Sequence, residues 1–581
     1  MKLRKTLSCA LGALVLASSF ASMVGCGGEQ LFGGGEDKDN PKVDVTKSQL
    51  YVGVFDGGLG REWTEEARTL FEAQYAETSF ESGKKGVQIM YDYSKTDYLD
   101  ALIENMPHNR QEVYLLGQLK YYDFIDRGHL LDISDVVTEG GENSLENKMN
   151  SSLRDYFRIG TGTYYAFPLF ESYVHMIYDV DLFDKEHLWF APDGGFVEVD
   201  NASTTPGARR PGLSGGVDGW DAGLPETYTE FFILLEEMVA RGIIPFTWSG
   251  AQVGTYLQHM TTSFWADYQG SVEFAQNFTM DGSVPVRTIE STDFTESEVG
   301  KFSLPAEVFS TATMTTSNAQ EVAAKEAGKY FALKLAHDIM YGKKYVNQAR
   351  VNSPAESHLN AQATYLQSTR SSKKIAMLVE GNWWYNEAKA VMDAMKVYGS
   401  QYSDMGRRFG IMPIPKADDG SSAEGRTLTS PGDSTAVFVS KYIAKTKIDL
   451  AKKFLRFLNT EESMRRFTVA TKTMRPYDYT LTDEDVSKLP YYTKNWIEAR
   501  EDITMEYLAP RTTELRVHND YLLSADWMFT SRFNIGYGAN TMDFSSPISA
   551  YFNYPDCTAK QWFQGLETFR KVKPYDFSKE P

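Results

Sequence analysis

Strand-like runs alternate with helical patterns along this chain, and the alternation limits the folds open to it more than any other feature. Residues 50–55 form a β-rich run that stops at a Gly-rich turn, residues 56–60, and apolar residues then recur at helical spacing over 63–74. Further strands are predicted at 87–91 and 113–116. This order predicts an α/β sheet, and ligands commonly bind beyond the C-terminal ends of such strands.

The same alternation continues through the rest of the chain. Residues 224–239 combine a capping box with apolar residues at helical spacing, which predicts a helix. A strand-like run at 435–440 precedes another helical pattern at 450–458. Two segments without periodicity, 192–223 and 279–316, are predicted to be exposed loops or hairpins.

Size, charge and cysteine content limit the classes of function that this chain can have. With 581 residues, 42% of them hydrophobic, the chain can bury large cores and should form two lobes or domains. Its formal net charge of −19 argues against nucleic acid as a partner. Of its three cysteines, Cys9 and Cys26 lie in or beside the first apolar segment, so no disulfide framework is predicted. Cys557 has no histidine nearby in sequence, which indicates an inert thiol rather than a nucleophile.

The N-terminus has the anatomy of a secretory leader. Three basic residues precede an apolar run at 7–23, which is short for a membrane span. The run ends in the sequence MVGC, residues 23–26, which resembles the lipobox of bacterial lipoproteins. On that resemblance residues 1–25 are a signal peptide, Cys26 carries the lipid anchor, and residues 26–47 form a flexible tether. The alternative is an uncleaved apolar anchor with a chance cysteine. Everything after Cys26 is expected outside the cytoplasm, at the outer face of the bacterial cytoplasmic membrane.

Motifs for catalysis are mostly absent. A G-x-S-x-G match at 212–216 follows residues 208–211, which are not a buried strand, so no nucleophilic serine is predicted. The eight histidines show no metal-binding spacing, and there is no Walker A or G-x-G-x-x-G motif. We therefore predict no cofactor, no metal and no enzymatic activity. A glycosidase pair of carboxylates, drawn from 78 acidic residues, stays open as an alternative.

Four segments occur in an order that resembles the extracellular solute-binding proteins of ABC importers, the group that includes maltose-binding protein. They are YYAFP with YVHMIYDVDLF at 164–183, LPETYTEF continuing to GIIPF at 224–246, KIAMLVEGNWW at 374–384, and FGIMPIP with the following strand and helix at 409–457. The individual motifs are degenerate, but their order together with the lipobox is a specific joint signal.

This resemblance implies a periplasmic-binding-protein-like (type II) α/β fold, with two lobes that close about a hinge on a ligand. It places residues 48–168 plus 426–476 in lobe 1 and residues 169–425 plus 477–581 in lobe 2. The insert at 192–223 and the region after 477 depart from the family pattern.

Sugar sites combine flat aromatic side chains with carboxylates and amides, and this chain is 13% aromatic. Trp383 matches the family's ligand-stacking position, whereas Trp384 should point the other way if its strand continues. The other candidates follow predicted strands or lie at the expected lobe crossing, and each has a structural alternative in core packing or turn formation. They are Trp248, Tyr256, Asp56, Gln118, Glu171, Tyr173 and Asp433.

The sequence thus predicts a substrate-binding lipoprotein of an ABC importer that captures a carbohydrate, most consistent with an oligosaccharide. Its predicted partners are the ligand, ABC permease subunits and the membrane through its lipid, with a monomeric chain. A cell-surface glycoside hydrolase and a protein presenting its ligand to a membrane sensor are the alternatives. Peptides, polyols and other organic solutes also stay open as ligands.

Overall fold

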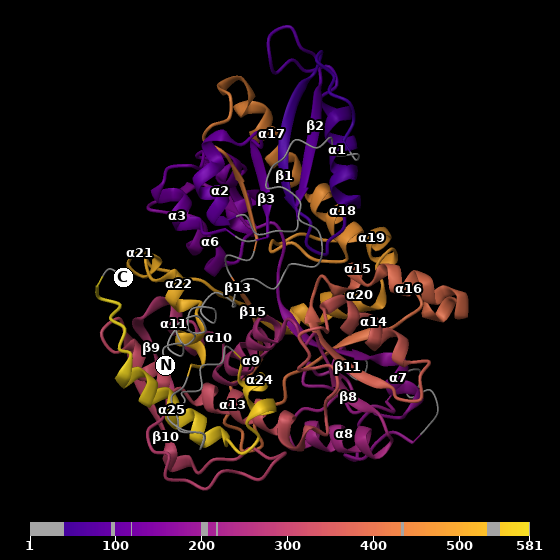
Figure 1. Cartoon of the computed structure of the whole chain (residues 1–581), viewed down its shortest axis with the longest axis vertical. Helices are drawn as coiled ribbons and strands as arrows, with labels where there is room; N and C mark the ends of the chain where they lie inside the picture. Colours follow the sequence, from indigo (N-terminus) through magenta and orange to yellow (C-terminus); the bar gives the residue numbers. More distant parts are fainter. Residues whose placement is uncertain are drawn as a thin grey trace, which may run out of the picture.

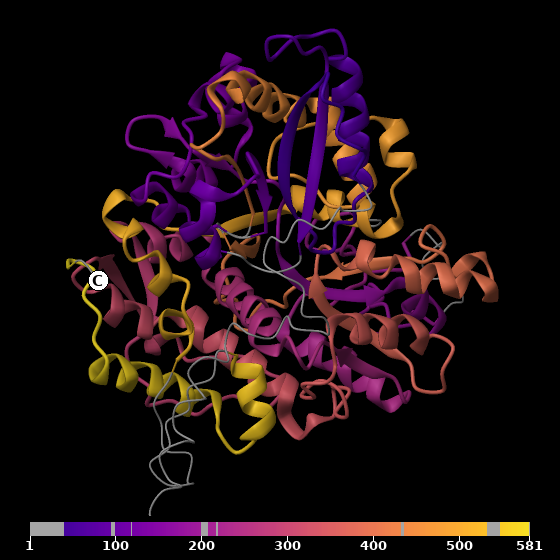
Figure 2. The ribbon, with the colours of Figure 1, turned by 45° about the horizontal axis from the view of Figure 1, so that its top comes forward.

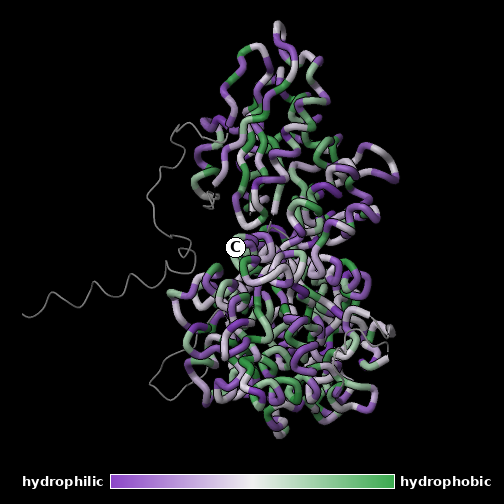
Figure 3. Tube along the Cα trace, turned by 90° about the vertical axis from the view of Figure 1, so that its right-hand side faces the viewer, coloured by the Kyte–Doolittle hydropathy of each residue, from purple (hydrophilic) through white to green (hydrophobic). Residues whose placement is uncertain are grey.

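Two lobes make up the molecule in the computed structural model, which describes residues 40–94, 99–117, 119–198, 207–216, 219–431, 435–530 and 546–579. Viewed from the side, the chain forms two bodies joined by a narrower middle (Figure 3). One body is built on a five-stranded sheet and the other on a four-stranded sheet. A separate two-stranded sheet lies between them (Figure 1).

The first sheet has the strand order β2-β1-β3-β14-β6. β1 is parallel to both β2 and β3, whereas β14 is antiparallel to β3 and β6. The strands are β1 (Ser48–Phe55), β2 (Val87–Ser94), β3 (Val113–Leu116), β6 (Ala166–Phe167) and β14 (Ala436–Val439). The four strands predicted in this part of the chain are confirmed, and β14 joins the sheet from far along the sequence.

Helices α1 (Glu62–Gln74), α17 (Ile448–Leu458) and α18 (Glu461–Thr471) pack together beside this sheet (Figure 1). The fully buried ring of Phe71 on α1 lies 5.1 Å from Phe454 and 5.4 Å from Phe457. This contact explains the helical spacing of apolar residues in both segments, because each helix buries one stripe. The remaining helices of the lobe are α2 (Leu99–Asn105), α3 (Tyr121–Asp126), α4 (Ser134–Thr138), α5 (Leu145–Lys148) and α6 (Ser151–Phe157).

The second sheet has the order β12-β7-β11-β8, with β11 parallel to β8 and antiparallel to β7. Its strands are β7 (Val174–Asp179), β8 (Ile244–Thr247), β11 (Ile375–Gly381) and β12 (Phe409–Met412). The predicted capping box is confirmed: Thr227 accepts a bond from the Glu230 amide at 3.3 Å, and α8 (Tyr228–Ala240) begins there. Around the sheet lie α7 (Val180–Lys185), α9 (Val253–Gln269), α13 (Ala327–Met340), α14 (His358–Ser368), α15 (Trp384–Glu387), α16 (Lys389–Met395) and α20 (Tyr491–Asp502).

The segments without sequence periodicity pack on this lobe. Residues 279–316 contain the antiparallel pair β9 (Asp281–Ile289) and β10 (Phe309–Thr315), so the prediction of a hairpin is confirmed. Within 192–223, the Arg210 amide donates to the Phe190 carbonyl, its carbonyl accepts from the Gly223 amide, and its side chain pairs with Glu230 on α8. The described part of this insert is therefore fixed to the lobe.

The C-terminal region is also packed into the second lobe, and its yellow helices cover the outer side in Figure 2. The buried ammonium of Lys329 on α13 and the guanidinium of Arg570 both donate to the carbonyl of Trp527, at 2.8 and 2.6 Å. The elements here are α21 (Thr513–Arg516), α22 (Asn519–Leu522), α23 (Ala525–Met528), α24 (Pro547–Asn553) and α25 (Ala559–Val572), with α10 (Ser271–Phe274), α11 (Gln276–Thr279) and α12 (Ala319–Ala324) nearby.

The chain passes between the two sheets three times. It leaves β6 for β7 through residues 168–173, returns from β13 (Arg426–Pro431) to β14, and leaves α18 for α20 through α19 (Asp483–Ser487). β13 pairs in parallel with β15 (Ile503–Leu508) to form the sheet between the lobes. The lobes are therefore joined by several strands of chain, which restricts how they can move relative to one another.

Buried side chains hold these crossings together. Arg475, which is 2% exposed, donates to the carbonyls of Leu169 at 2.8 Å and Leu458 at 2.6 Å. Thr435 donates its hydroxyl to the Phe170 carbonyl at 2.9 Å and accepts from the Leu169 amide at 3.0 Å. Since residues 168–173 have no strand partner, these bonds satisfy backbone groups that would otherwise be buried without one.

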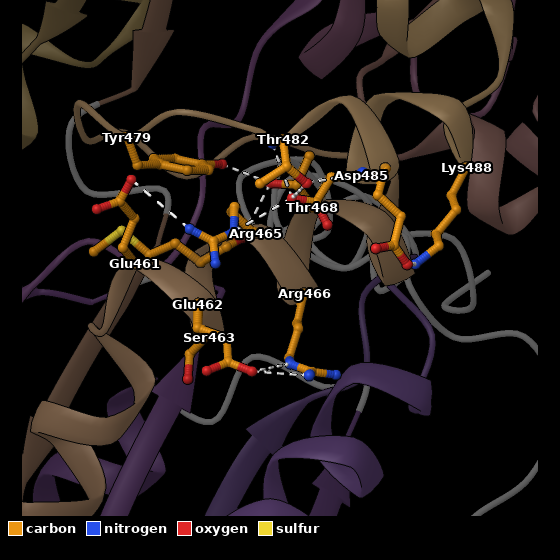
Figure 4. A network of polar contacts seen from close by, with 12 residues as sticks. Glu461, Glu462, Ser463, Arg465, Arg466, Thr468, Tyr479, Thr482, Asp485 and Lys488 are labelled. Carbon is orange, nitrogen blue, oxygen red and sulfur yellow. Dashed lines mark hydrogen bonds and ion pairs between the residues drawn. The ribbon is translucent and has the colours of Figure 1, made fainter.

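Helix α18, which directly precedes the third crossing, also holds this crossing in place. The Tyr479 hydroxyl bonds to Thr468 at 2.5 Å and accepts from the Arg475 amide at 3.0 Å. Figure 4 shows Arg465 reaching Asp485 of α19, while Arg466 lies on the opposite side of the helix with Glu462. The inner face of α18 thus holds the crossing, and the outer face carries exposed ion pairs.

We expect Arg475→Ala to lower the free energy of unfolding by about 3 kcal/mol, because two buried carbonyls lose a charged donor. Arg466→Ala is the matched control. It removes an exposed arginine from the neighbouring helix α18, and the ion pairs of Arg466 with Glu462 and Glu66 should be worth less than about 1 kcal/mol. Urea unfolding of both variants measures the difference, and equal losses would contradict a role for Arg475 in holding the crossings.

Candidate functional site

The turn after β1 forms the lobe 1 side of the candidate site. Asp56 ends the strand, and its carboxylate accepts from Arg61 at 2.8 Å, while the Arg61 guanidinium lies 4.1 Å from the centre of the Tyr93 ring. Gly58 and Gly60 have φ of +86° and +72°, the left-handed region that favours glycine. Asp56 therefore stabilises the turn through its ion pair with Arg61. Turn formation was the structural alternative to ligand binding for this residue.

The end of β11 forms the lobe 2 side. The strand stops at Gly381, and Trp383 lies in the turn before α15 with its ring partly exposed. The ring packs against Gly381, where an added Cβ would come within 2.2 Å of it, and meets Tyr256 of α9 edge-on at 5.9 Å. Because a glycine and a tyrosine fix the indole, Trp383 offers a preformed flat surface.

Trp384 lies on the other side of this turn and is fully buried. Its ring packs against Phe409 at 5.2 Å and Tyr492 at 5.6 Å. The expectation that the two tryptophans point apart agrees with this placement, but the reason differs. The strand does not continue; it ends at Gly381, and Trp384 begins helix α15.

Two carboxyl groups meet beneath the aromatic pair. The side-chain amide of Gln362 donates to Glu380 at 3.1 Å and to Glu387 at 2.9 Å, and the Gly381 amide donates to Glu380 at 2.8 Å. Burial, and then the charge of Glu387, raise the pKa of the Glu380 carboxyl well above its usual range. Burial likewise raises the pKa of the Tyr256 phenol, with Glu380 as the next cause.

The two sides come together between the lobes. Asn386 donates its side-chain amide to the Gly58 carbonyl at 3.3 Å, and Lys389 pairs with Glu62 at 3.1 Å. Beside these contacts is a cavity of about 290 Å³, lined from lobe 1 and the third crossing by Glu62, Glu66, Val469, Ala470 and Lys472, and from lobe 2 by Tyr385, Asn386, Lys389 and Asp404. Carboxylates, an amide and lysines thus line this cavity, and Trp383 directly precedes the helix α15 that carries Asn386. Aromatic and polar groups of this kind suit a polyhydroxylated ligand.

Three other predicted residues lie in the core, two of them bonded to Asn382 beside Trp383. Trp248 is 1% exposed and donates its indole N–H to the Val351 carbonyl at 2.9 Å. Glu171 pairs with Arg500 at 2.7 Å, and Tyr173 stacks on Trp496 at 4.4 Å, both at the first crossing. Their partners in the core and at the crossing give them structural roles, so we do not include them in the site. Gln118, Asp433 and Cys26 lie outside the described residues.

The sequence analysis missed Gln362, Glu380, Asn386 and Glu387. Asn386 and Glu387 follow Trp383 within four residues, so the end of the matched motif was the one available signal for them. Gln362 lies on α14 with no local signal of its role. In the part of the chain that the structure describes, no group of three or more His, Cys, Asp and Glu side chains could hold a metal ion.

Comparison with known proteins identifies relatives of the whole fold. A sequence model of bacterial extracellular solute-binding proteins matches residues 62–465. A chitin oligosaccharide binding protein superposes with a TM-score of 0.50 at 14% identity, covering 92% of this chain and 100% of that one. Maltose-bound MalE3 of T. maritima superposes with a TM-score of 0.52 at 13% identity, covering 90% and 99%. No curated protein matches the sequence. The likeness confirms the predicted two-lobed α/β fold.

The buried Glu380 carboxyl gives a pH-dependent prediction. Between its ordinary pKa near 4.5 and its raised value, the folded protein holds a proton that the unfolded chain has released, so stability falls as pH rises. Glu380→Gln removes this proton. We expect the variant to gain stability relative to the unmodified protein as pH increases from about 4 to about 8, measured by urea unfolding.

The control for this experiment is Glu484→Gln, because Glu484 is an exposed carboxylate whose side chain is 79% accessible. Its effect on stability should change little over the same pH range. A stability difference for Glu380→Gln that stays constant with pH would mean that Glu380 is ionised in the folded protein.

Proposed function

The chain belongs to the bacterial extracellular solute-binding protein family, and we propose that it captures a carbohydrate between its lobes and releases it chemically unchanged. The observation that carries the proposal is the partly exposed Trp383 ring, held by Gly381 and Tyr256 above the Glu380–Gln362–Glu387 cluster. Sugars present apolar C–H faces between hydroxyl edges, so a fixed and partly exposed indole complements the apolar faces, and the buried cluster supports the indole. The names of the two similar structures, which mention chitin oligosaccharide and maltose, favour an oligosaccharide.

Binding would couple to closure of the lobes. A ligand that contacts both lobes favours the closed state only by its additional affinity for that state. We propose residues 48–168 plus 426–476 as lobe 1 and residues 169–425 plus 477–581 as lobe 2. The pairing of β14 with β3 and β6 supports the assignment of that strand to lobe 1. β13 lies at the start of the range 426–476 and pairs with β15 in the sheet between the lobes.

We further propose that the monomeric protein delivers its ligand to ABC permease subunits from outside the cytoplasm. The support is the family membership together with the lipobox-like sequence at residues 23–26. Within the described residues, no helix is both long enough and apolar enough to cross a membrane. Attachment would then depend on acyl chains at Cys26, each buried CH₂ contributing about 0.8 kcal/mol. Presentation of the ligand to a membrane sensor is the alternative within the same binding role.

The geometry of the carboxyl pair does not favour hydrolysis. A glycosidase places its two carboxyl groups on either side of the scissile bond, about 5–9.5 Å apart. Glu380 is 0% exposed, however, and its carboxyl accepts a bond from Gln362 within the core. A buried carboxyl cannot reach a sugar held at Trp383, so we propose that this pair supports the site and performs no chemistry.

We expect Trp383→Ala to weaken carbohydrate binding by about 1–3 kcal/mol, because the ligand loses its stacking surface. A thermal-shift screen against mono- and oligosaccharides identifies a ligand, since binding raises the melting temperature. Calorimetry on the ligand then measures Kd for each variant.

Tyr398→Ala is the matched control, because Tyr398 is 52% exposed on the same lobe and packs against Arg370 instead of the site. Its Kd should equal that of the unmodified protein. Unchanged affinity of Trp383→Ala would remove Trp383 from the site, and cleavage products in the ligand solution would overturn the binding proposal.

We expect Cys26→Ser to move the protein from the membrane fraction to the soluble fraction of cells, because the acylated residue is lost. Cys557→Ser serves as control, since Cys557 is buried in the second lobe with a thiol pKa raised by burial to about 12. Fractionation followed by immunoblotting gives the distribution. Retention of the Cys26→Ser variant in the membrane would indicate an uncleaved apolar anchor.

A further inference from the structure

The lobes touch beside the candidate site through one short stretch on each side. The contacts are the hydrogen bond from Asn386 to the Gly58 carbonyl, at 3.3 Å, and the ion pair of Lys389 with Glu62, at 3.1 Å. We call these four residues, Gly58, Glu62, Asn386 and Lys389, the interlobe latch. All four belong to the turn and first helix after β1 or to the two short helices after β11.

The turn in lobe 1 is shaped for this contact. A Cβ on Gly58 would lie 2.8 Å from the carboxylate of Glu387, and a Cβ on Gly60 would lie 2.8 Å from the side-chain amide of Asn386. Both positions also have positive φ. Glycine is therefore required twice over, once by the backbone conformation and once by the approach of the opposite lobe.

The latch is weak by the nature of its contacts. Lys389 and Glu62 have side chains that are 44% and 73% exposed, and exposed ion pairs shift an equilibrium by only about five-fold or less. A contact of this strength can bias the lobes toward the closed arrangement without preventing them from opening.

The latch also shares its segment with the ligand site. Asn386 and Lys389 follow Trp383 by three and six residues, and Glu387 between them is bonded to Gln362 of the carboxyl cluster. A movement that brings Trp383 toward lobe 1 therefore brings the latch residues with it.

We propose that the interlobe latch sets the fraction of ligand-free protein in which the lobes are closed, and thereby tunes ligand affinity through residues that need not touch the ligand. Asn386 and Lys389 are positioning residues in this scheme. The effect on affinity rests on the proposed binding function, whereas the effect on the lobes does not. Affinity changes because the apparent Kd depends on the fraction of protein in the binding-competent state.

Charge reversal tests the latch without any ligand. Spin labels at Glu77→Cys in lobe 1 and Val397→Cys in lobe 2, both on highly exposed positions, report the interlobe distance in a Cys26→Ser background. We expect Lys389→Glu to broaden this distance distribution toward longer values, because it faces Glu62. The double variant Lys389→Glu with Glu62→Lys should return the distribution to that of the parent.

Lys396→Glu is the matched control. Lys396 is 46% exposed in the same lobe, and its ion pairs with Asp393 and Asp404 stay within that lobe. It should leave the interlobe distance unchanged. An unchanged distance in Lys389→Glu, or a double variant that fails to restore it, would overturn the proposal.

A pair of glycine variants tests the close approach separately. Gly58→Ala and Gly83→Ala introduce the same backbone strain, at φ of +86° and +78°, but no atom lies within 4 Å of a Cβ on Gly83. Only Gly58→Ala should shift the distance to longer values, and equal effects would contradict the latch. Because these distances are measured without ligand, failure to find a carbohydrate ligand would contradict the proposed function but would not affect the test of the latch.

Discussion

Backbone groups at the middle of the molecule must find hydrogen-bond partners where no sheet can supply them. Residues 168–173 leave one sheet and have not yet entered the other, and Arg475 and Thr435 satisfy their carbonyls and amides from the two other crossings. The first crossing is therefore held by side chains of the other two, although these lie far apart in sequence. This bonding fixes the point about which the lobes are joined, and the relative placement of the elements on either side depends on it.

An ion pair with a buried carboxylate supports the same region from lobe 2. Glu171, within the first crossing, pairs with Arg500 of α20 and accepts a further bond from Tyr507 of β15. Burial still raises the pKa of Glu171, so desolvation outweighs the attraction of the arginine. The pair therefore determines which segments of the chain meet and contributes little net stability. The long C-terminal region, a departure from the family pattern, supplies both partners of Glu171.

The candidate site is rigid for a related reason. Trp383 rests on Gly381 and Tyr256, and the Glu380 carboxyl beside Tyr256, whose pKa burial raises, accepts a bond from Gln362. Such a site is prepared before any ligand arrives, so little binding free energy is spent on ordering side chains. The latch contacts between the lobes are in contrast exposed. Arg516 of the second lobe adds bonds to the carbonyls of Asp155 and Arg158 in the first lobe. A rigid site beside exposed contacts between the lobes suits closure on a ligand.

Local patterns in the sequence determined the elements and the fold class. The strands at 50–55, 87–91, 113–116 and 435–440 and the capped helix of 224–239 follow from periodicity and short motifs, because neighbouring residues decide them. Tertiary structure alone decided that Trp248, Glu171 and Tyr173 are buried and that Gln362 joins Glu380 to Glu387. Their partners stand up to some 330 positions away, as with Glu171 and Arg500, so no local pattern encodes the contact. Burial and pairing at such distances are properties of the packed chain, and only its folding brings these groups together.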